Sequence, residues 1–133
     1  MTAKVKFEHR SACPIASTLD AVGDKWSMVI LRDLLTGKRR FGQFLTSPER
    51  ITTNVLAERL ARLEAFGLIK KQAYSEHPPR FEYLLTEKGA GLLPVLQDIS
   101  RWANRYLPGT WRPPDMFMRM KVKRYGRKSQ TSL

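Results

Sequence analysis

The chain has 133 residues, a single cysteine and a formal net charge of +12, so its length fits one domain with a tail. Residues 112–133 carry a net charge of +6, whereas residues 11–111 carry a net charge of only +4. This balance favours a polyanionic partner such as nucleic acid over a merely soluble basic surface. The lone cysteine excludes an internal disulfide and fits the reducing cytoplasm, and no apolar run or leader pattern predicts a membrane span or secretion.

Two helices are predicted in the first forty residues. Cys13-Pro14 should start the first, because proline suits the first helical position and so places Cys13 near the N-cap. Its apolar face carries Ile15, Leu19 and Val22, and a glycine follows directly. Residues 25–37 are strongly apolar and close on a glycine, so we expect this second helix to be the main core element.

Residues 39–67 have the pattern of a helix-turn-helix. Apolar side chains recur at helical spacing over 39–45, and the Ser-Pro pair at 47–48 should break that short helix. A second helix should start at Thr52 or Thr53 and stop at Gly67. Its predicted buried stripe consists of Leu56, Leu60 and Leu63.

A β-hairpin should follow this second helix. Residues 68–75 and 81–86 are strand-like runs on either side of a proline-stiffened turn at 76–80. A short scaffold helix, a second helix with a polar outer face and a basic hairpin together form a winged helix-turn-helix, which puts its second helix into the DNA major groove. The predicted fold class is therefore α+β and mostly helical.

The C-terminal part should contain a long helix capped by Thr86, with Pro94 either kinking it early or marking its true start. Its broad apolar face is Leu92, Leu93, Leu96, Ile99, Trp102, Ala103 and Tyr106. Prolines and a glycine at 108–114 then separate a domain, residues 1–111, from a basic tail, residues 112–133. Residues 118–123 alternate strictly, which fits an edge strand as well as a disordered arm.

Several motifs resemble those of one regulator family. They are Cys13-Pro14, V-G-D-K-W-S at 22–27, L-L-T-G-K-R-R-F-G-Q-F at 34–44, the leucine pattern ending in G-L-I at 56–69, Y-S-E-H-P-P-R-F-E-Y-x-L-T at 74–86 and L-L-P-V-L at 92–96. Over about residues 12–107 the chain resembles the HxlR-type winged helix-turn-helix regulators. It departs from their pattern at Asn54, which is often lysine, and at Ala61, which is frequently arginine, and the basic tail lies outside it.

The resemblance implies a bacterial or archaeal transcription factor, and we expect a repressor rather than an activator. It also implies a homodimer that pairs through its N-terminal and C-terminal helices. The flanking positions expected at this interface are Ile15, Leu19, Leu96, Ile99, Trp102, Ala103 and Tyr106. The terminal helix alone presents more apolar surface than one small domain can cover, which independently favours an interface. A dimer would read a pseudo-palindromic site in double-stranded DNA.

The first turns of the second helix are the candidate base-reading surface, formed by Thr52, Thr53, Asn54 and Ala57. Asn54 can bond bidentately to adenine, whereas the duller alternative is a solvated Asn54 behind a threonine cap. Glu58 faces the same way and should point at a cytosine amine or into the open groove, because phosphate repels it. Arg62 flanks this face.

Basic residues near the hairpin and before the short helix are candidate backbone contacts. In the wing they are Lys70, Lys71 and Arg80, and before the short helix they are Lys38, Arg39 and Arg40. Arg80 should reach the minor groove or a phosphate, although a solvated turn is the plain alternative. The tail 112–133 should add phosphate attraction, or its methionines should pack on the partner subunit.

Cys13 is a candidate sensor of a small electrophile or oxidant. The positive end of a helix dipole, with Arg10 or Lys25 nearby, favours a reactive thiolate, whereas the alternative is an inert, half-buried cysteine. The sequence shows no catalytic motif, and its two histidines, His9 and His77, suggest no metal site, so we expect neither an enzyme nor a cofactor. A basic RNA-binding or nucleoid-associated protein without an effector is the alternative function.

Overall fold

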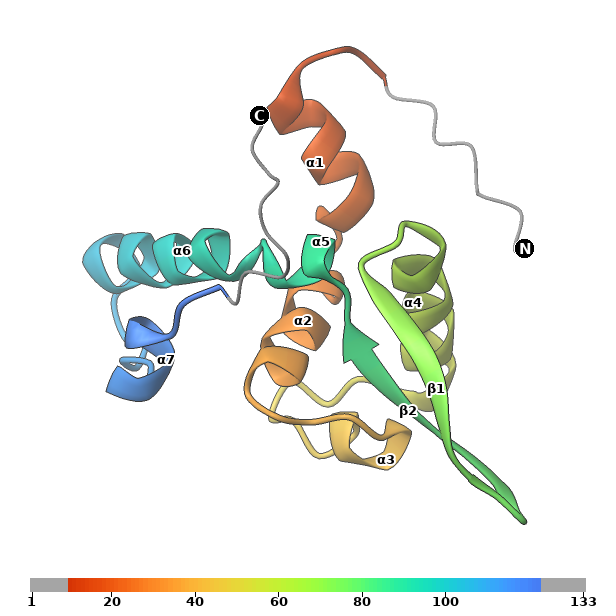
Figure 1. Ribbon diagram of the computed structural model, residues 1–133. Helices are drawn as coiled ribbons and strands as arrows, with labels where there is room; N and C mark the ends of the chain where they lie inside the picture. The colour runs from red at the N-terminus through yellow and green to blue at the C-terminus, as the bar shows by residue number, and fades with distance from the viewer. Residues whose placement is uncertain (1–9, 123–133) are drawn as a thin grey trace.

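The computed structural model describes residues 10–122 and has a group of helices with a two-stranded hairpin that extends from one side (Figure 1). In chain order the elements are α1 (Pro14–Val22), α2 (Ser27–Leu35), α3 (Phe41–Phe44), α4 (Thr53–Ala65), β1 (Ile69–Glu76), β2 (Pro79–Leu85), α5 (Glu87–Ala90), α6 (Leu93–Tyr106) and α7 (Asp115–Arg119). This order confirms the predicted fold class, a mostly helical winged helix-turn-helix. Among the described residues, no helix is both long and apolar enough to span a bilayer.

The core lies where α2, α4 and the base of the hairpin meet. Ile30 and Leu31 of α2 are almost fully buried. The predicted α4 stripe, Leu56, Leu60 and Leu63, has at most 1% of its surface exposed. Leu68 and Ile69 continue this core into β1, so α4 and the hairpin share one apolar base. The helical period of α4 therefore leaves its opposite face free for solvent or a ligand.

The Asp24 carboxylate caps the start of α2 and connects α2 to α4. The Asp24 side chain accepts hydrogen bonds from the backbone N–H groups of Trp26 (3.0 Å) and Ser27 (3.1 Å). It also accepts from the Ser27 hydroxyl (2.5 Å) and from Arg59 Nε (2.8 Å) of α4. Partial burial by itself raises the pKa of Asp24, but the hydrogen bonds from Ser27, Arg59 and the backbone outweigh it and lower the pKa to about 2.

The hairpin is joined to the end of α4 and to the loop before α3. Gly67 ends α4 with a φ of 79°, a left-handed conformation that favours glycine. The Thr86 hydroxyl donates to the Gly67 carbonyl (2.6 Å), and a Cβ on Gly89 would lie only 2.0 Å from the Leu68 carbonyl oxygen. The strands pair antiparallel with a bulge at Ala73/Ser75, and their turn contains a cis peptide bond before Pro78. The predicted hairpin is confirmed.

The region after the hairpin is two helices rather than one. Thr86 caps the short α5 through Gly89 N–H (3.1 Å), and the chain bends before α6 begins at Leu93. Pro94 lies in the first turn of α6, where its missing N–H costs no helical hydrogen bond. Of the two predictions for Pro94, the one that it marks the true start of the helix describes the structure.

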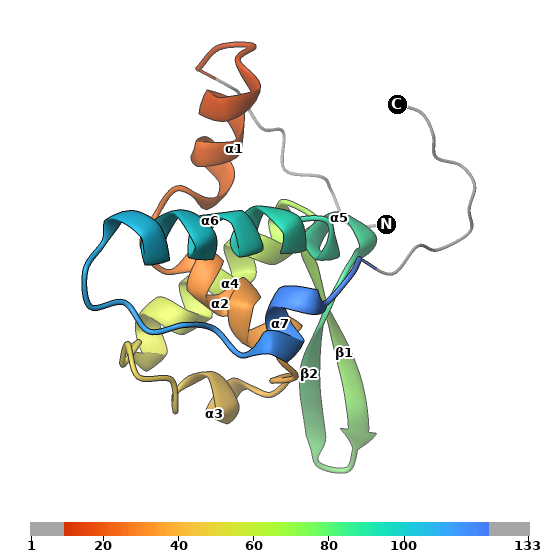
Figure 2. The ribbon, with the colours of Figure 1, turned by 90° about the vertical axis from the view of Figure 1, so that its left-hand side faces the viewer.

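The start of the basic tail packs on its own chain. Residues 115–119 form α7, and Phe117 is buried against the core. Of the stretch 118–123, residues 118 and 119 belong to this helix and 120–122 form no strand, so the edge-strand prediction is wrong for the described residues. The Gln97 side-chain amide of α6 donates to the carbonyls of Phe117 (3.0 Å), Met118 (3.3 Å) and Met120 (2.9 Å), which fixes this segment beside α6 (Figure 2). Residues 123–133 lie outside the described residues, so a phosphate-binding role for that end of the tail stays a prediction.

Removing the Asp24 carboxylate should destabilise the fold in a pH-dependent way. Asp24→Ala should lower the free energy of unfolding by about 2 kcal/mol near pH 7, because α2 loses its cap and Arg59 loses its partner. The pKa of Asp24 is lower in the folded chain than its ordinary value of 3.8. Its contribution is therefore fully present above about pH 4 and declines as the pH falls toward 2.

Urea unfolding of the wild type and the variant at several pH values measures this difference. Asp98→Ala is the matched control, because the pair of Asp98 with Arg101 is exposed and should contribute less than about 1 kcal/mol. A difference between wild type and Asp24→Ala that does not shrink below pH 4 would contradict the assignment.

Candidate nucleic-acid interface

The first turn of α4 presents a small polar surface to solvent. Thr52 is the N-cap, and its hydroxyl accepts from Val55 N–H (3.4 Å), as the cap prediction requires. Thr53, Asn54 and Ala57 are all exposed, whereas Leu56 beneath them is fully buried. The core contacts of α4 therefore hold Asn54 outward on a fixed helix, the geometry that base reading needs.

Two carboxylates hold the loop that leads into α4. Asp33 of α2 is buried and accepts from the Ser47 hydroxyl (2.5 Å) of that loop. Arg32 donates to Asp33 and also to both oxygens of Glu49 (2.7 and 2.9 Å). The hydrogen bond with Glu49 raises the pKa of Arg32 above its ordinary value, and the same bond lowers the pKa of Glu49. Sequence reasoning found none of these residues except the loop-breaking serine.

The three predicted basic clamps before α3 have different environments. Lys38 is half-buried, and its ammonium group donates to Ser47 (2.7 Å) and lies 3.9 Å from Asp33. Its charge is therefore already paired within the chain. Arg40 is exposed and its guanidinium lies 4.0 Å from the centre of the Tyr74 ring on β1. Arg39 is exposed, and its carbonyl accepts from Tyr83 N–H (2.7 Å) of β2. The loop 38–40 is thus packed against the wing.

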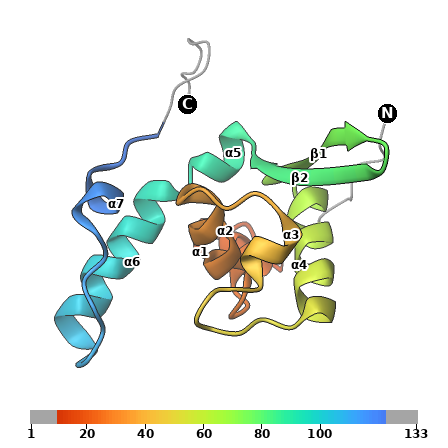
Figure 3. The ribbon, with the colours of Figure 1, turned by 90° about the horizontal axis from the view of Figure 1, so that it is seen from below.

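The wing carries its predicted basic residues on the surface. Lys70 and Lys71 are exposed on β1, and Lys71 lies 4.6 Å over the ring of Phe81 on β2. Arg80 is exposed beside the turn, where it pairs in register with Ser75. Figure 3 shows α4 and the hairpin at the same end of the molecule, with α6 and α7 at the other. The helix with the exposed polar residues and the basic hairpin therefore lie at the same end of the molecule.

The remaining charged residues of α4 are partly occupied by internal contacts. Glu58 is exposed and paired with Arg59, which sequence reasoning missed and which joins α4 to Asp24. Arg62 is half-buried, donates to the Asp20 carbonyl (3.1 Å) of α1 and lies over the ring of Phe66. Contact of Glu58 or Arg62 with DNA stays a prediction, and one terminal nitrogen of Arg62 is already used in the bond to Asp20.

The flanking helices leave large apolar side chains in solvent. Ile15 (71% exposed) and Leu19 (54%) lie on α1, and Trp102 and Tyr106 (57% each) lie on α6. Ile99 is also exposed and Ala103 half-buried, but Leu96 is 8% exposed and belongs to the chain's own core. Leu96 therefore offers a partner much less surface than its place in the apolar pattern suggested.

Cys13 has the predicted position at the start of α1. It is the N-cap residue, it is exposed, and its carbonyl accepts from Ser17 N–H (2.9 Å). Its sulfur caps no backbone N–H of the helix, so the expected contact between the sulfur and the helix amides is not formed. The nearby Arg10 is bonded to Asp20 (2.5 Å).

Comparison with known proteins gives one consistent family. Residues 21–110 match the model of the HxlR-like helix-turn-helix family. YdeP, an uncharacterised helix-turn-helix transcriptional regulator of Bacillus subtilis, is 39% identical over 94 residues, which are 71% of this chain and 73% of YdeP.

Two solved structures of regulators have the same fold. The transcriptional regulator YodB from Bacillus subtilis, in its reduced form, aligns with a TM-score of 0.63 at 32% identity, over 75% of this chain and 99% of YodB. The redox regulator HypR in its oxidised form aligns with a TM-score of 0.64 at 35% identity, over 70% of this chain and 96% of HypR. These relatives are regulators and not enzymes. The chain belongs to the HxlR-like helix-turn-helix family of DNA-binding transcriptional regulators.

Proposed function

We propose that this protein is a cytoplasmic, homodimeric repressor that binds a pseudo-palindromic operator and releases it when an electrophile or oxidant modifies Cys13. The observation that carries the proposal is the pairing of two surfaces on one chain. One is the polar face of α4 beside the basic wing, and the other is the exposed apolar surface of α1 and α6. Membership in a family of DNA-binding regulators disfavours the alternative of an RNA-binding or nucleoid-associated protein.

The apolar surface supports a dimer. α1 rises from the body in both Figure 1 and Figure 2, and Ile15 and Leu19 are exposed along it. Ile99, Trp102 and Tyr106 form a second exposed row on α6, and Trp102 packs on Tyr106 with ring centres 5.6 Å apart. Apolar patches of this extent on a soluble protein normally mark an interface. A two-fold dimer would place its two α4 helices about 34 Å apart, one turn of DNA.

Adding a charge to the proposed interface should separate the subunits. Trp102→Glu should shift the protein from dimer to monomer at micromolar concentration, because a carboxylate would be buried without a partner. Sedimentation velocity measures the change. Met116→Glu, at a residue that is 78% exposed on α7, is the control and should remain dimeric. A wild-type monomer at micromolar concentration would contradict the dimer.

The arrangement of polar and basic groups supports two kinds of DNA contact, one to bases and one to phosphates. Asn54 is exposed on the first turn of α4, where its amide can donate to and accept from an adenine edge. Arg39 and Arg80 are exposed on the loop and the wing and can contact phosphates. Base contacts specify the sequence, whereas phosphate contacts position the protein on any sequence.

Two substitutions separate these roles. Asn54→Ala should weaken operator binding by about 1–3 kcal/mol and leave binding to random duplex unchanged. Arg80→Ala should weaken binding to both DNAs and reduce the salt dependence by roughly one phosphate contact. Fluorescence anisotropy with operator and random DNA, over a range of salt concentrations, measures both effects. Equal losses on both DNAs for Asn54→Ala would show that Asn54 is not a base reader.

The position of Cys13 supports a sensing role. Its thiol is exposed at the start of α1, the helix that carries Ile15 and Leu19 of the proposed interface. When a quinone reacts, the sulfur forms a C–S bond to the ring, and the ring gains the thiol proton to become a hydroquinone thioether. A bulky adduct there would disturb α1 and so the spacing of the two α4 helices. HypR, one of the structural relatives, is a redox regulator.

Quinone treatment tests this role directly. Benzoquinone should release wild-type protein from its operator, and Cys13→Ser should stay bound under the same treatment. Mass spectrometry should find the adduct on the wild type alone, and gel shift should follow release. Release of both proteins, or of neither, would rule out Cys13 as the sensor.

A further inference from the structure

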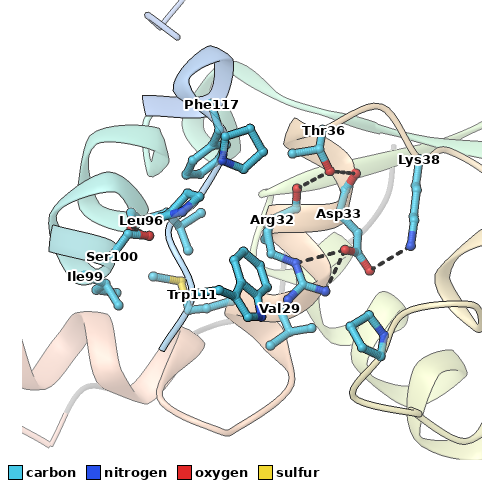
Figure 4. A pocket seen from close by; sticks show the side chains of 14 residues that line it. Val29, Arg32, Asp33, Thr36, Lys38, Leu96, Ile99, Ser100, Trp111 and Phe117 are labelled. Atoms are coloured by element: carbon cyan, nitrogen blue, oxygen red, sulfur yellow. Dashed lines mark hydrogen bonds and ion pairs between the residues drawn. The ribbon is translucent and has the colours of Figure 1, made fainter. Parts of the chain in front are cut away.

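A cavity of about 530 Å³ lies between α2, α6 and the segment that leads into α7 (Figure 4). Its apolar wall is formed by Met28, Val29, Leu96, Ile99, Trp111 and Phe117. This volume falls within the range of pockets that bind small molecules. Trp111 and Phe117 lie beyond residue 110, so part of the wall comes from a segment outside the family match.

Arg32 borders the polar end of the cavity, and most of its N–H groups already donate to carboxylates of the same chain. Its Nε and one terminal nitrogen donate to Asp33 (3.0 and 2.8 Å), and both terminal nitrogens donate to Glu49. These bonds use four of the five in-plane N–H groups, so the flat faces are the largest part of the guanidinium left for contact with a ligand. Guanidinium faces and indole rings both stack on aromatic systems.

The charges around this end cancel. Arg32 and Lys38 are matched by Asp33 and Glu49, through contacts of 2.7 to 3.9 Å. The Thr36 and Ser100 hydroxyls that border the cavity donate to backbone carbonyls of their own helices. The cavity therefore offers aromatic and apolar contact but no uncompensated charge, so a carboxylate or an ammonium ion would lose its hydration without gaining a partner.

We propose that this cavity binds an uncharged, planar aromatic molecule, which stacks on Trp111 and on the guanidinium face of Arg32. All the residues that line the site belong to one chain, and Ile99 among them is also part of the exposed row on α6 that we assign to the dimer interface. Cys13 does not line the cavity.

The same arginine connects the cavity to the loop before α4. Glu49 and Ser47 belong to that loop, and they bond to Arg32 and Asp33 respectively. A ligand that shifts Arg32 would therefore move the loop that positions α4. In this way a local change in the cavity would alter the orientation of a helix on another part of the molecule. This regulatory part of the proposal rests on the proposed function, whereas the binding part does not.

Binding is tested with N-phenyl-1-naphthylamine, an uncharged aromatic probe whose fluorescence rises in apolar surroundings. The wild type should bind one probe per chain and saturate. Trp111→Ala should weaken binding by about tenfold, the scale of one lost aromatic contact. Because Trp111 is 68% exposed, its loss should leave the fold intact. Met116→Ala, in the same segment but off the cavity wall, is the matched control and should bind as the wild type does. Unsaturable binding, or equal affinity of the wild type and Trp111→Ala, would overturn the site.

Two competitors with the same rings test the ligand class. At neutral pH, 2-naphthol is uncharged and 2-naphthoate is an anion. The naphthol should displace the probe at a concentration at least about tenfold lower, because only the naphthoate must shed a charge's hydration. Tighter binding of the naphthoate would overturn the uncharged class. Sedimentation with the probe present tests whether the partner chain fills the cavity in the dimer. If the probe dissociates the dimer, the cavity is part of the dimer interface and the proposal is wrong.

The link to α4 is tested with Glu49→Gln, which weakens the bond to Arg32 without removing a cavity wall. The probe should bind this variant as it binds the wild type, but its effect on operator affinity should be lost. In the wild type the probe should change operator affinity by at least about threefold. No change in the wild type would overturn the regulatory part while leaving the binding result standing. Operator binding without the probe tests the proposed function separately.

Discussion

The buried carboxylate of Asp33 is the constraint on which the half of the molecule with α4 and the hairpin depends. It is 4% exposed, and a charge at that depth is stable only when it is fully paired. Arg32 and Ser47 supply hydrogen bonds and Lys38 supplies nearby charge, and Glu49 then holds the outer side of Arg32. The loop between α3 and α4 is thereby fixed to α2. This loop and the buried leucines of α4 together set the orientation of α4. Asp24 makes a second, separate tie between α2 and α4 through Arg59.

The opposite half of the molecule is built on different physics. α1 and α6 are held to the body by few buried side chains and expose several large apolar ones. In a monomer the apolar side chains of these helices stay in contact with water, which is unfavourable. Association of two chains would bury them. Two sets of contacts connect this half to α4: Arg62 of α4 bonds directly to Asp20 of α1, and α2 contacts both α6 and the loop before α4. Arg32, with one side on the cavity and the other on Glu49, belongs to the second set.

Local patterns in the sequence predicted most of the fold. The leucines of α4, the cap at Thr52 and the stop at Gly67 follow from helical periodicity and backbone preference, which neighbouring residues decide. The ion network could not be predicted in this way, because Asp33 and Ser47 are 14 residues apart and meet only after folding. The same reason explains Lys38 and Arg62: both looked like free cations, but each finds a partner on another element. The alternation of 118–123 did not predict that residues 118 and 119 belong to α7, because the burial of Phe117 and its bond to Gln97 are contacts between residues far apart in the sequence.

In the proposed dimer, two copies of α4, each oriented by its own α2, read one face of a DNA duplex while the wings contact the flanking backbone. Hydroxyl-radical footprinting on a fragment that the purified protein retains from genomic DNA can detect this arrangement. We expect two protected segments whose centres are separated by one helical turn, about 10 base pairs, on one face of the duplex, with weaker protection outside each from the wings. A single protected segment, or protection spread evenly around the helix, would contradict it.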